Sequence, residues 1–169
     1  CKDNLEMLQQ SSIIKSSLHN VVLLKWPLKA SDSLRDCSFY RVSAYDDHNT
    51  TSGAFQDFNC GTNTYDGHRG TDISIWPFNF YKMDHDLVEV VAAAPGIILD
   101  KHDGEFDKNC AGNNLTANYI IIRHSDGSQA NYWHLKKNSL TKKAIGQTVT
   151  AGEFLGIVGS SGSSSGPHL

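Results

Sequence analysis

The feature that most constrains the fold of this chain is a pair of apolar, alternating segments on either side of Asp126-Gly127. The segments are Asn118–Arg123 and Ser128–Leu135, and Asp-Gly between two such segments predicts a β-hairpin with a type I′ turn. A two-residue loop fixes the register of the hairpin and places His134 opposite Tyr119, at the end far from the turn. The hairpin therefore favours an antiparallel β architecture.

Short strand patterns continue through most of the chain, whereas helical periodicity is confined to its start. The expected strands are Val21–Trp26, Phe39–Tyr45, Thr71–Phe78, Leu87–Ala94, Ile97–Leu99 and two short segments within Gly146–Gly159. Residues 1 to about 20 have apolar side chains at loosely helical spacing, which indicates a short helix or a tether. The sequence predicts a mostly β fold, with an antiparallel β-sheet domain over residues 26–169 and an N-terminal segment over residues 1–25.

The segment Ser160–Gly166 admits two interpretations. Its serine and glycine composition is typical of a flexible linker, but it stands directly before Pro167-His168. We expect a turn that leads into a functional strand.

Composition excludes several classes of protein. The chain has 169 residues, which favours one domain, and its net charge of −3 is spread along the sequence without a basic stripe. Nucleic acid is therefore a poor candidate partner. No apolar run approaches the roughly 20 residues that span a bilayer.

Four cysteines, Cys1, Cys37, Cys60 and Cys110, allow three complete pairings, and no C-x-x-C pair points to a cysteine zinc site. Two interpretations remain: buried thiols in a cytosolic protein, or an exported protein with at least one disulfide. We favour the second, because Cys60 and Cys110 lie in segments rich in Gly and Asn. Cys1 also allows membrane anchoring through a lipidated cysteine, the alternative being that the chain simply starts there.

Three separated histidine motifs carry the candidate chemistry. His68 and Asp72 form an H-x-x-x-D motif, and in a strand their even offset places both side chains on one face. Gly67 and Gly70 leave room beside them for a metal ion or a substrate. His134 lies near the end of the hairpin strand, and His168 follows Gly166-Pro. Imidazole and carboxylate are suitable zinc ligands, although each motif alone is also typical of a surface or buried histidine.

Taken in order, these motifs resemble the lysostaphin-type (LytM-like) zinc metallopeptidases. The resemblance rests on Tyr65-Asp-Gly-His68-Arg-Gly-Thr-Asp72, on Tyr132-Trp-His134-Leu and on Gly152–Leu169, and it extends over roughly residues 26–169. It implies a compact antiparallel β-sheet domain, zinc as the cofactor and bacterial peptidoglycan peptides as the substrate. By the same resemblance, His68 and Asp72 are zinc ligands, and His134 and His168 are the catalytic histidines.

The resemblance also implies a third zinc ligand, the second histidine of an H-x-H motif, which should follow Leu169 directly. The sequence ends at Leu169. We expect that the chain is part of a longer protein that continues with this histidine. The alternatives are a ligand from a neighbouring molecule or a water, and a natural non-enzymatic relative.

The function that the resemblance implies is a zinc-dependent endopeptidase acting outside the bacterial cytoplasm, in the periplasm, in the cell envelope or as a secreted protein. One of His134 and His168 accepts a proton from the attacking water, and the other helps to stabilise the tetrahedral oxyanion. Tyr65 and Tyr132 are candidates for a further hydrogen bond to that oxyanion. The alternative function is a non-catalytic relative that binds peptidoglycan or activates another wall hydrolase.

Overall fold

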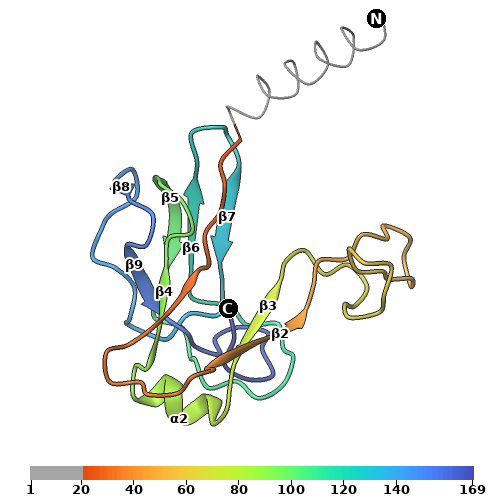
Figure 1. The fold of residues 1–169 in the computed structure, drawn as a ribbon, viewed down its shortest axis with the longest axis horizontal. Helices are drawn as coiled ribbons and strands as arrows, with labels where there is room; N and C mark the ends of the chain where they lie inside the picture. The colour runs from red at the N-terminus through yellow and green to blue at the C-terminus, as the bar shows by residue number, and fades with distance from the viewer. Residues whose placement is uncertain (1–20) are drawn as a thin grey trace, which may run out of the picture.

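The computed structural model describes residues 21–169, so the helix or tether expected over residues 1–20 lies outside the described residues. The elements are β1 (Leu28–Ala30), β2 (Tyr40–Ala44), β3 (Asp72–Ile75), α2 (Asn79–Asp84), β4 (Val88–Val91), β5 (Gly96–His102), β6 (Tyr119–Arg123), β7 (Gln129–Tyr132), β8 (Thr148–Val149) and β9 (Phe154–Ile157). Figure 1 shows their arrangement. The predicted mostly β fold is confirmed.

Three antiparallel sheets organise the described residues (Figure 1). The largest has the order β7-β6-β5-β8, the second the order β1-β4-β9, and the third pairs β2 with β3. Isolated bridges connect the sheets: Leu135 pairs with Val158, and His168 pairs with both Ser74 and Gly159. The last residues of the chain thus lie between β3 and the segment that follows β9.

The core forms where alternating apolar side chains of these sheets meet. Val88 and Val90 on β4, and Ile120 and Ile122 on β6, are all at most 1% exposed, as the two-residue period of a strand requires. Their neighbours in the sequence are more exposed, so each strand presents one face to the core. The apolar alternation read from the sequence therefore reports the side of each strand that is buried.

The hairpin formed by β6 and β7 is present, but its register differs from the prediction. Arg123 pairs with Gln129 and Ile120 pairs with Tyr132. Continued past the end of β7, this register aligns His134 with Asn118. The prediction that His134 lies opposite Tyr119 is wrong by one residue.

The cause of the shift is a three-residue turn in place of the expected type I′ turn. His124 and Ser128 close the loop, because the His124 N–H donates to the Ser128 carbonyl and the Gly127 N–H donates to the His124 carbonyl. Only Gly127 has a positive φ, of 86°, whereas a type I′ turn requires positive φ at both central residues. The Asp126 carboxylate instead accepts hydrogen bonds from the backbone N–H and the hydroxyl of Ser128.

Two other predicted strands differ from the structure. Residues 21–26 form no strand; the first strand begins at Leu28, the first buried residue of this segment, and Leu23 is 83% exposed. The strand expected over residues 71–78 ends at Ile75. Phe78 then adopts a left-handed conformation with φ 57° and starts the short helix α2, which was not predicted.

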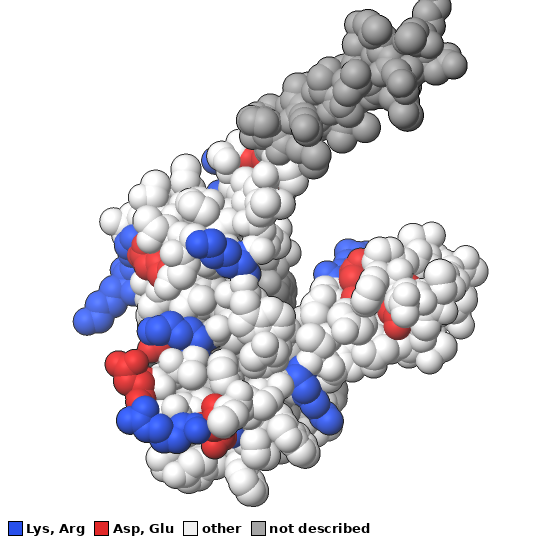
Figure 2. All heavy atoms as spheres, viewed as in Figure 1, with Lys and Arg blue, Asp and Glu red and all other residues white. Residues whose placement is uncertain are grey.

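A lobe formed by residues 45–67 projects from the body between β2 and β3 (Figure 1). On the face shown in Figure 2, a deep notch separates the lobe from the body. The lobe has no regular element, and two carboxylates organise it. Asp47 accepts backbone N–H groups of Asn49, Gln56 and Gly67, and Asp57 does the same for residues 59, 61 and 63.

The cysteine interpretation is not supported. Cys37, Cys60 and Cys110 are exposed free thiols, so the described residues contain no disulfide, and Cys1 lies outside them. Basic and acidic side chains are interspersed on the face in Figure 2. Within residues 21–169, no helix has the length and apolarity needed to cross a membrane.

Candidate active site

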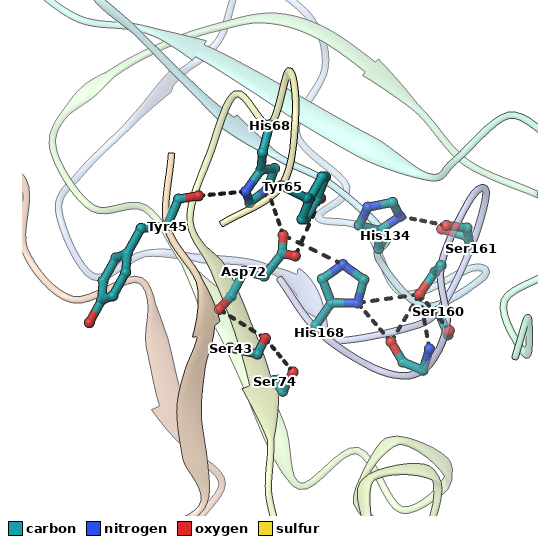
Figure 3. Close-up of polar contacts among 12 residues, drawn as sticks. Ser43, Tyr45, Tyr65, His68, Asp72, Ser74, His134, Ser160, Ser161 and His168 are labelled. Atoms are coloured by element: carbon teal, nitrogen blue, oxygen red, sulfur yellow. Dashed lines mark hydrogen bonds and ion pairs between the residues drawn. The ribbon is translucent and has the colours of Figure 1, made fainter. Parts of the chain in front are cut away.

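Four residues predicted from three separate motifs meet at one end of β3 (Figure 3). His68 lies at the base of the lobe, and Asp72 is the first residue of β3. His134 follows β7 by two residues, and His168 bridges β3 and Gly159. The site is therefore assembled from the lobe, a hairpin and the end of the chain.

His68 and Asp72 are in direct contact. The His68 Nε2 atom lies 3.0 Å from Oδ1 of Asp72, and the His68 Nδ1 atom lies 2.7 Å from the carbonyl oxygen of Tyr45. The alternation expected from a strand does not produce this contact, because residues 68–71 precede β3. The two side chains meet instead across the irregular segment 68–71 that precedes β3.

The bond to Tyr45 determines which nitrogen of His68 carries a proton. A carbonyl oxygen only accepts, so Nδ1 carries the proton, and in the neutral ring Nε2 presents a lone pair. That lone pair faces a carboxylate oxygen at 3.0 Å, an arrangement that is favourable only with a cation or a proton between the two atoms. His68 and Asp72 therefore fit a bound metal ion.

Tyr65 covers this pair from the lobe. Its ring stacks on His68 with centroids 4.1 Å apart, and its hydroxyl donates to Oδ2 of Asp72 at 3.4 Å. Burial, and then the charge and hydrogen bond of Asp72, raise the pKa of Tyr65 to about 12. The phenol thus stays protonated and remains a hydrogen-bond donor.

His134 is held in a strained conformation. Its φ is 62°, in the left-handed region that side chains other than Gly rarely adopt. This backbone turns the imidazole out of the line of β7, and its Nδ1 atom lies 2.7 Å from the Ser161 carbonyl oxygen. Burial, and then the neighbouring His168, lower the pKa of His134, so its ring favours the neutral form.

His168 completes the cluster from the opposite side. Its Nδ1 atom lies 2.7 Å from the Gly166 carbonyl oxygen and 3.3 Å from the Ser164 hydroxyl. Its Nε2 atom is 3.9 Å from Oδ1 of Asp72, and its ring centroid is 4.5 Å from that of His134. The two imidazoles thus lie side by side, next to the His68–Asp72 pair (Figure 3).

All three imidazoles follow one arrangement. Each has Nδ1 on a backbone carbonyl, which leaves Nε2 free to face the site in the neutral ring. Such bonds fix the tautomer and the orientation of histidines that bind metals or transfer protons. Within residues 21–169, no three His, Cys, Asp or Glu side chains form a complete metal-binding group. His68 and Asp72 on their own are too few to complete such a group.

Several residues that position the site were not predicted. Gly159 has no side chain, and this allows the backbone of residues 134–136 to approach it closely. A Cβ atom there would lie 2.7 Å from the His134 carbonyl oxygen and 2.4 Å from the Lys136 nitrogen. Asn118 and Ser161 are fully buried, and both side chains bond to the Leu135 carbonyl next to His134. For Ser161, the signal available in the sequence was the position of Ser160–Gly166 directly before Pro167-His168.

The expected turn at Ser160–Gly166 is confirmed, and the interpretation of Tyr132 is corrected. Ser160, Ser161 and Ser164 are at most 2% exposed and hydrogen-bonded, so Ser160–Gly166 is a packed turn and not a flexible linker. Tyr132 is 3% exposed, and its hydroxyl accepts the Ala93 backbone N–H. Burial in the core removes Tyr132 as a candidate for contact with an oxyanion.

The described residues form a β-sheet domain in which a carboxylate and one imidazole are paired beside two further imidazoles, a set of donor atoms that fits a metal ion. Residues 67–169 match the family described as peptidase family M23, and the chain belongs to this family. The matched segment contains all four residues of the cluster.

Two curated relatives support this assignment. The chain is 40% identical over 72 residues to a protein of Haemophilus influenzae named as an uncharacterized metalloprotease, which covers 43% of this chain. It is 37% identical over 85 residues, or 50% of this chain, to the peptidoglycan DD-endopeptidase ShyC of Vibrio cholerae. The aligned segments cover 14% and 19% of the lengths of these two relatives, respectively.

Proposed function

We propose that this chain is the catalytic domain of a zinc-dependent endopeptidase that hydrolyses peptide bonds of bacterial peptidoglycan. The observation that carries the proposal is the His68–Asp72 pair, whose lone pair and carboxylate oxygen face each other at 3.0 Å beside two oriented imidazoles. Membership of peptidase family M23 supports the reaction class. We place the domain at residues 26–169, as the sequence predicts.

Zinc held by His68 and Asp72 would supply Lewis acidity toward a substrate carbonyl and a water molecule. Tyr45 orients His68 through the carbonyl that accepts from Nδ1. Tyr65 holds the Asp72 carboxylate through its hydroxyl, and its ring limits access of solvent to His68. These contacts keep both ligands in place before substrate binds.

His134 is the proposed proton acceptor. Burial lowers its pKa, so the neutral ring with its Nε2 lone pair dominates near neutral pH. The Ser161 carbonyl accepts from Nδ1 and stabilises the imidazolium that forms when Nε2 takes the proton of the attacking water. The His134 imidazolium then donates that proton from Nε2 to the leaving amine, and the neighbouring His168, in its doubly protonated form, donates from Nε2 to the oxyanion.

The substrate class rests on the named relative. The protein of Vibrio cholerae is a peptidoglycan DD-endopeptidase, and we infer that this chain also acts on peptidoglycan peptides, outside the cytoplasm. Anchoring through a lipidated Cys1 stays a prediction, because Cys1 lies outside the described residues.

Digestion of purified peptidoglycan, followed by mass spectrometry of the released fragments, tests the proposal. We would use the chain as given and a form with one histidine appended after Leu169. We expect peptide cleavage that a chelator abolishes and zinc restores. His134→Ala should lower the rate by a factor of about 100 or more, whereas His102→Ala, on the surface, should not. Chelator-resistant cleavage, or no cleavage by either form, would contradict the proposal.

A non-catalytic peptidoglycan-binding module is the second candidate. It is favoured by one observation, that the described residues hold no complete group of three metal ligands. Cosedimentation with intact peptidoglycan separates the two candidates. Binding that persists in His134→Ala, without release of fragments by the unsubstituted chain, would favour the binding module.

A further inference from the structure

A groove of about 290 Å³ leads away from Asp72 and His168 across β3 and β2. Its lining includes Arg41, Ser43, Ser74 and Trp76 on one side, and Gly166 and His168 on the other. The proposed reaction uses only the end of this groove that lies at His168. The remainder has the size and continuity to hold a further part of a peptide.

The pairing of strands sets the order of side chains along the groove. Arg41 on β2 pairs with Ser74 on β3, and Ser74 pairs in turn with His168. Directly paired residues of antiparallel strands project to the same face, so Arg41, Ser74 and His168 form a row across the sheet. Because neighbouring strands lie about 4.8 Å apart, this row separates Arg41 from His168 by about 10 Å.

Arg41 is exposed and held in position without a charged partner. Its guanidinium carbon lies 5.0 Å from the centroid of the Trp76 ring, a cation–π contact that limits its rotamers. Within residues 21–169, no carboxylate forms an ion pair with it. The hydroxyls of Ser43 and Ser74, 2.8 Å apart, lie next to it on the same face. Arg41 therefore presents free N–H donors to the groove.

We propose that Arg41 is a specificity-determining residue that binds a free carboxylate of the peptide substrate. Arg41 lies in the groove lining away from His168, on Trp76, and its planar guanidinium matches the two oxygens of a carboxylate. The inference rests on the proposed endopeptidase function and adds the part of the substrate that is recognised.

The row of side chains also sets where this carboxylate lies in the substrate. An extended peptide advances about 3.3 Å per residue. A separation of about 10 Å between Arg41 and His168 thus corresponds to about three residues. The substrate is a peptide whose carboxylate lies about three residues from the bond that is cleaved.

Binding is tested without turnover. N-acetylated trialanine, as the free acid and as the C-terminal amide, is titrated into the full chain, and shifts of the Arg41 and Ser74 NMR signals are followed. We expect the acid to bind about tenfold more tightly than the amide, the effect of one charge-assisted contact. Arg41→Gln should remove the difference, whereas Arg123→Gln, an exposed arginine on β6, should retain it. Equal affinity of acid and amide, or an unchanged preference in Arg41→Gln, would overturn the inference.

Cleavage then separates this inference from the function on which it rests. Peptidoglycan stem peptides with a free or an amidated carboxylate are compared by kcat/KM in the zinc-loaded form that carries one histidine after Leu169. If the ratio of kcat/KM for the acid to that for the amide is above 1 and falls toward 1 in Arg41→Gln, both the role of Arg41 and the peptidase function are supported. Cleavage without a preference rejects the role of Arg41 and retains the peptidase. Selective binding of the acid without cleavage rejects the peptidase and retains the carboxylate site.

Discussion

At the scale of single residues, the site depends on backbone carbonyls more than on side chains. Three carbonyl groups, those of Tyr45, Ser161 and Gly166, orient the three imidazoles. No side-chain substitution removes a carbonyl, so the orientation of each ring is determined by the path of the chain. Residues that allow two segments to approach closely therefore matter as much as the histidines themselves.

Gly159→Ala tests this dependence. The added Cβ would lie 2.4 to 2.7 Å from backbone atoms of residues 134–136, too close to be relieved by a rotamer change. We expect a loss of about 3 kcal/mol in the free energy of unfolding, the upper end of the range for overpacking, and a loss of zinc-dependent activity. Urea denaturation measures the first.

The matched control is Gly112→Ala, where the nearest atom to the new Cβ is the Ser163 hydroxyl at 3.6 Å. Its free energy of unfolding should change by less than about 1 kcal/mol. Similar losses in both variants would show that the close approach at Gly159 is not responsible.

What the sequence reveals at this scale is side-chain chemistry, and what it hides is conformation. His68, Asp72, His134 and His168 are visible because imidazole and carboxylate are the donors that zinc requires. The left-handed φ of His134 is not visible, since nothing in its side chain favours that region. The contacts of Gly159 are also hidden, because they join segments more than 20 residues apart in the sequence.

At the scale of elements, strands were predicted better than the connections between them. β3 and β6 carry the alternation that burial of one face imposes. The turn after β6 was mistaken because the Asp126 carboxylate bonds to Ser128 and holds a conformation that the Asp-Gly pair alone does not specify. The lobe contains no such alternation, and its backbone is held instead by hydrogen bonds to the carboxylates of Asp47 and Asp57.

Asp47 links the lobe to the proposed metal-binding pair, His68 and Asp72. Its backbone N–H donates to the His68 carbonyl, and its carboxylate accepts from Gly67. The N–H groups of Gln56 and Asn49 lower the pKa of Asp47, and that of Gly67 contributes further. Asp47→Ala should weaken zinc binding about tenfold, as loss of an outer partner of a metal ligand commonly does. Titration with zinc of the form that carries a histidine after Leu169, followed by calorimetry, measures the affinity. Asp46→Ala, at the exposed neighbouring aspartate, should leave the affinity unchanged; equal effects would contradict a positioning role.

Asp126 fastens the start of the described chain to the hairpin turn. The Val22 N–H donates to its carboxylate at 2.8 Å. Hydrogen bonds from the Ser128 hydroxyl, then from the backbone N–H groups of Val22 and Ser128, lower the pKa of Asp126 from 3.8 to about 2. Because this pKa is depressed in the folded state, the stabilisation is present above about pH 4 and is lost as the pH falls through about 2.

We therefore expect the NMR shifts of the Val22 and Ser128 amides to titrate together with a midpoint near pH 2. Asp126→Asn should abolish that titration. The difference in unfolding free energy between the two forms should be constant above pH 4 and should shrink below it. A midpoint near 3.8 would show that the hydrogen bonds from Val22 and Ser128 to the Asp126 carboxylate are absent in solution.

At the scale of the whole molecule, the site forms because segments far apart in the sequence meet between the sheets. The sequence does not predict which strands share a sheet or how the sheets pack. Local patterns predicted an antiparallel β domain, and family resemblance predicted which residues converge. Neither predicts that β4 and β5, which follow each other in the chain, belong to different sheets. Nor do they predict that Gly159 and Ser74 flank His168. These neighbours are set by packing of the complete core.

The pairing of the last residues with β3 yields a prediction about the metal. Ile73 and Leu169 exchange both backbone hydrogen bonds, at 2.8 and 3.1 Å, and Ser74 pairs with His168. One residue appended after Leu169 in this register would lie opposite Asp72 and share its face of the sheet. A histidine appended there should therefore join His68 and Asp72 as a third ligand, so this form should bind about one equivalent of zinc.

An alanine appended at the same place is the control, and we expect it to bind zinc no better than the chain as given. Because the metal binds the folded state, zinc at about 100 times its Kd should add about 2.7 kcal/mol to the stability of the histidine form alone. Metal analysis after gel filtration and thermal unfolding with and without zinc measure both effects. Equal zinc content in the histidine and alanine forms would mean that the register seen at Leu169 does not continue, and that the third ligand must come from elsewhere in the assembled protein.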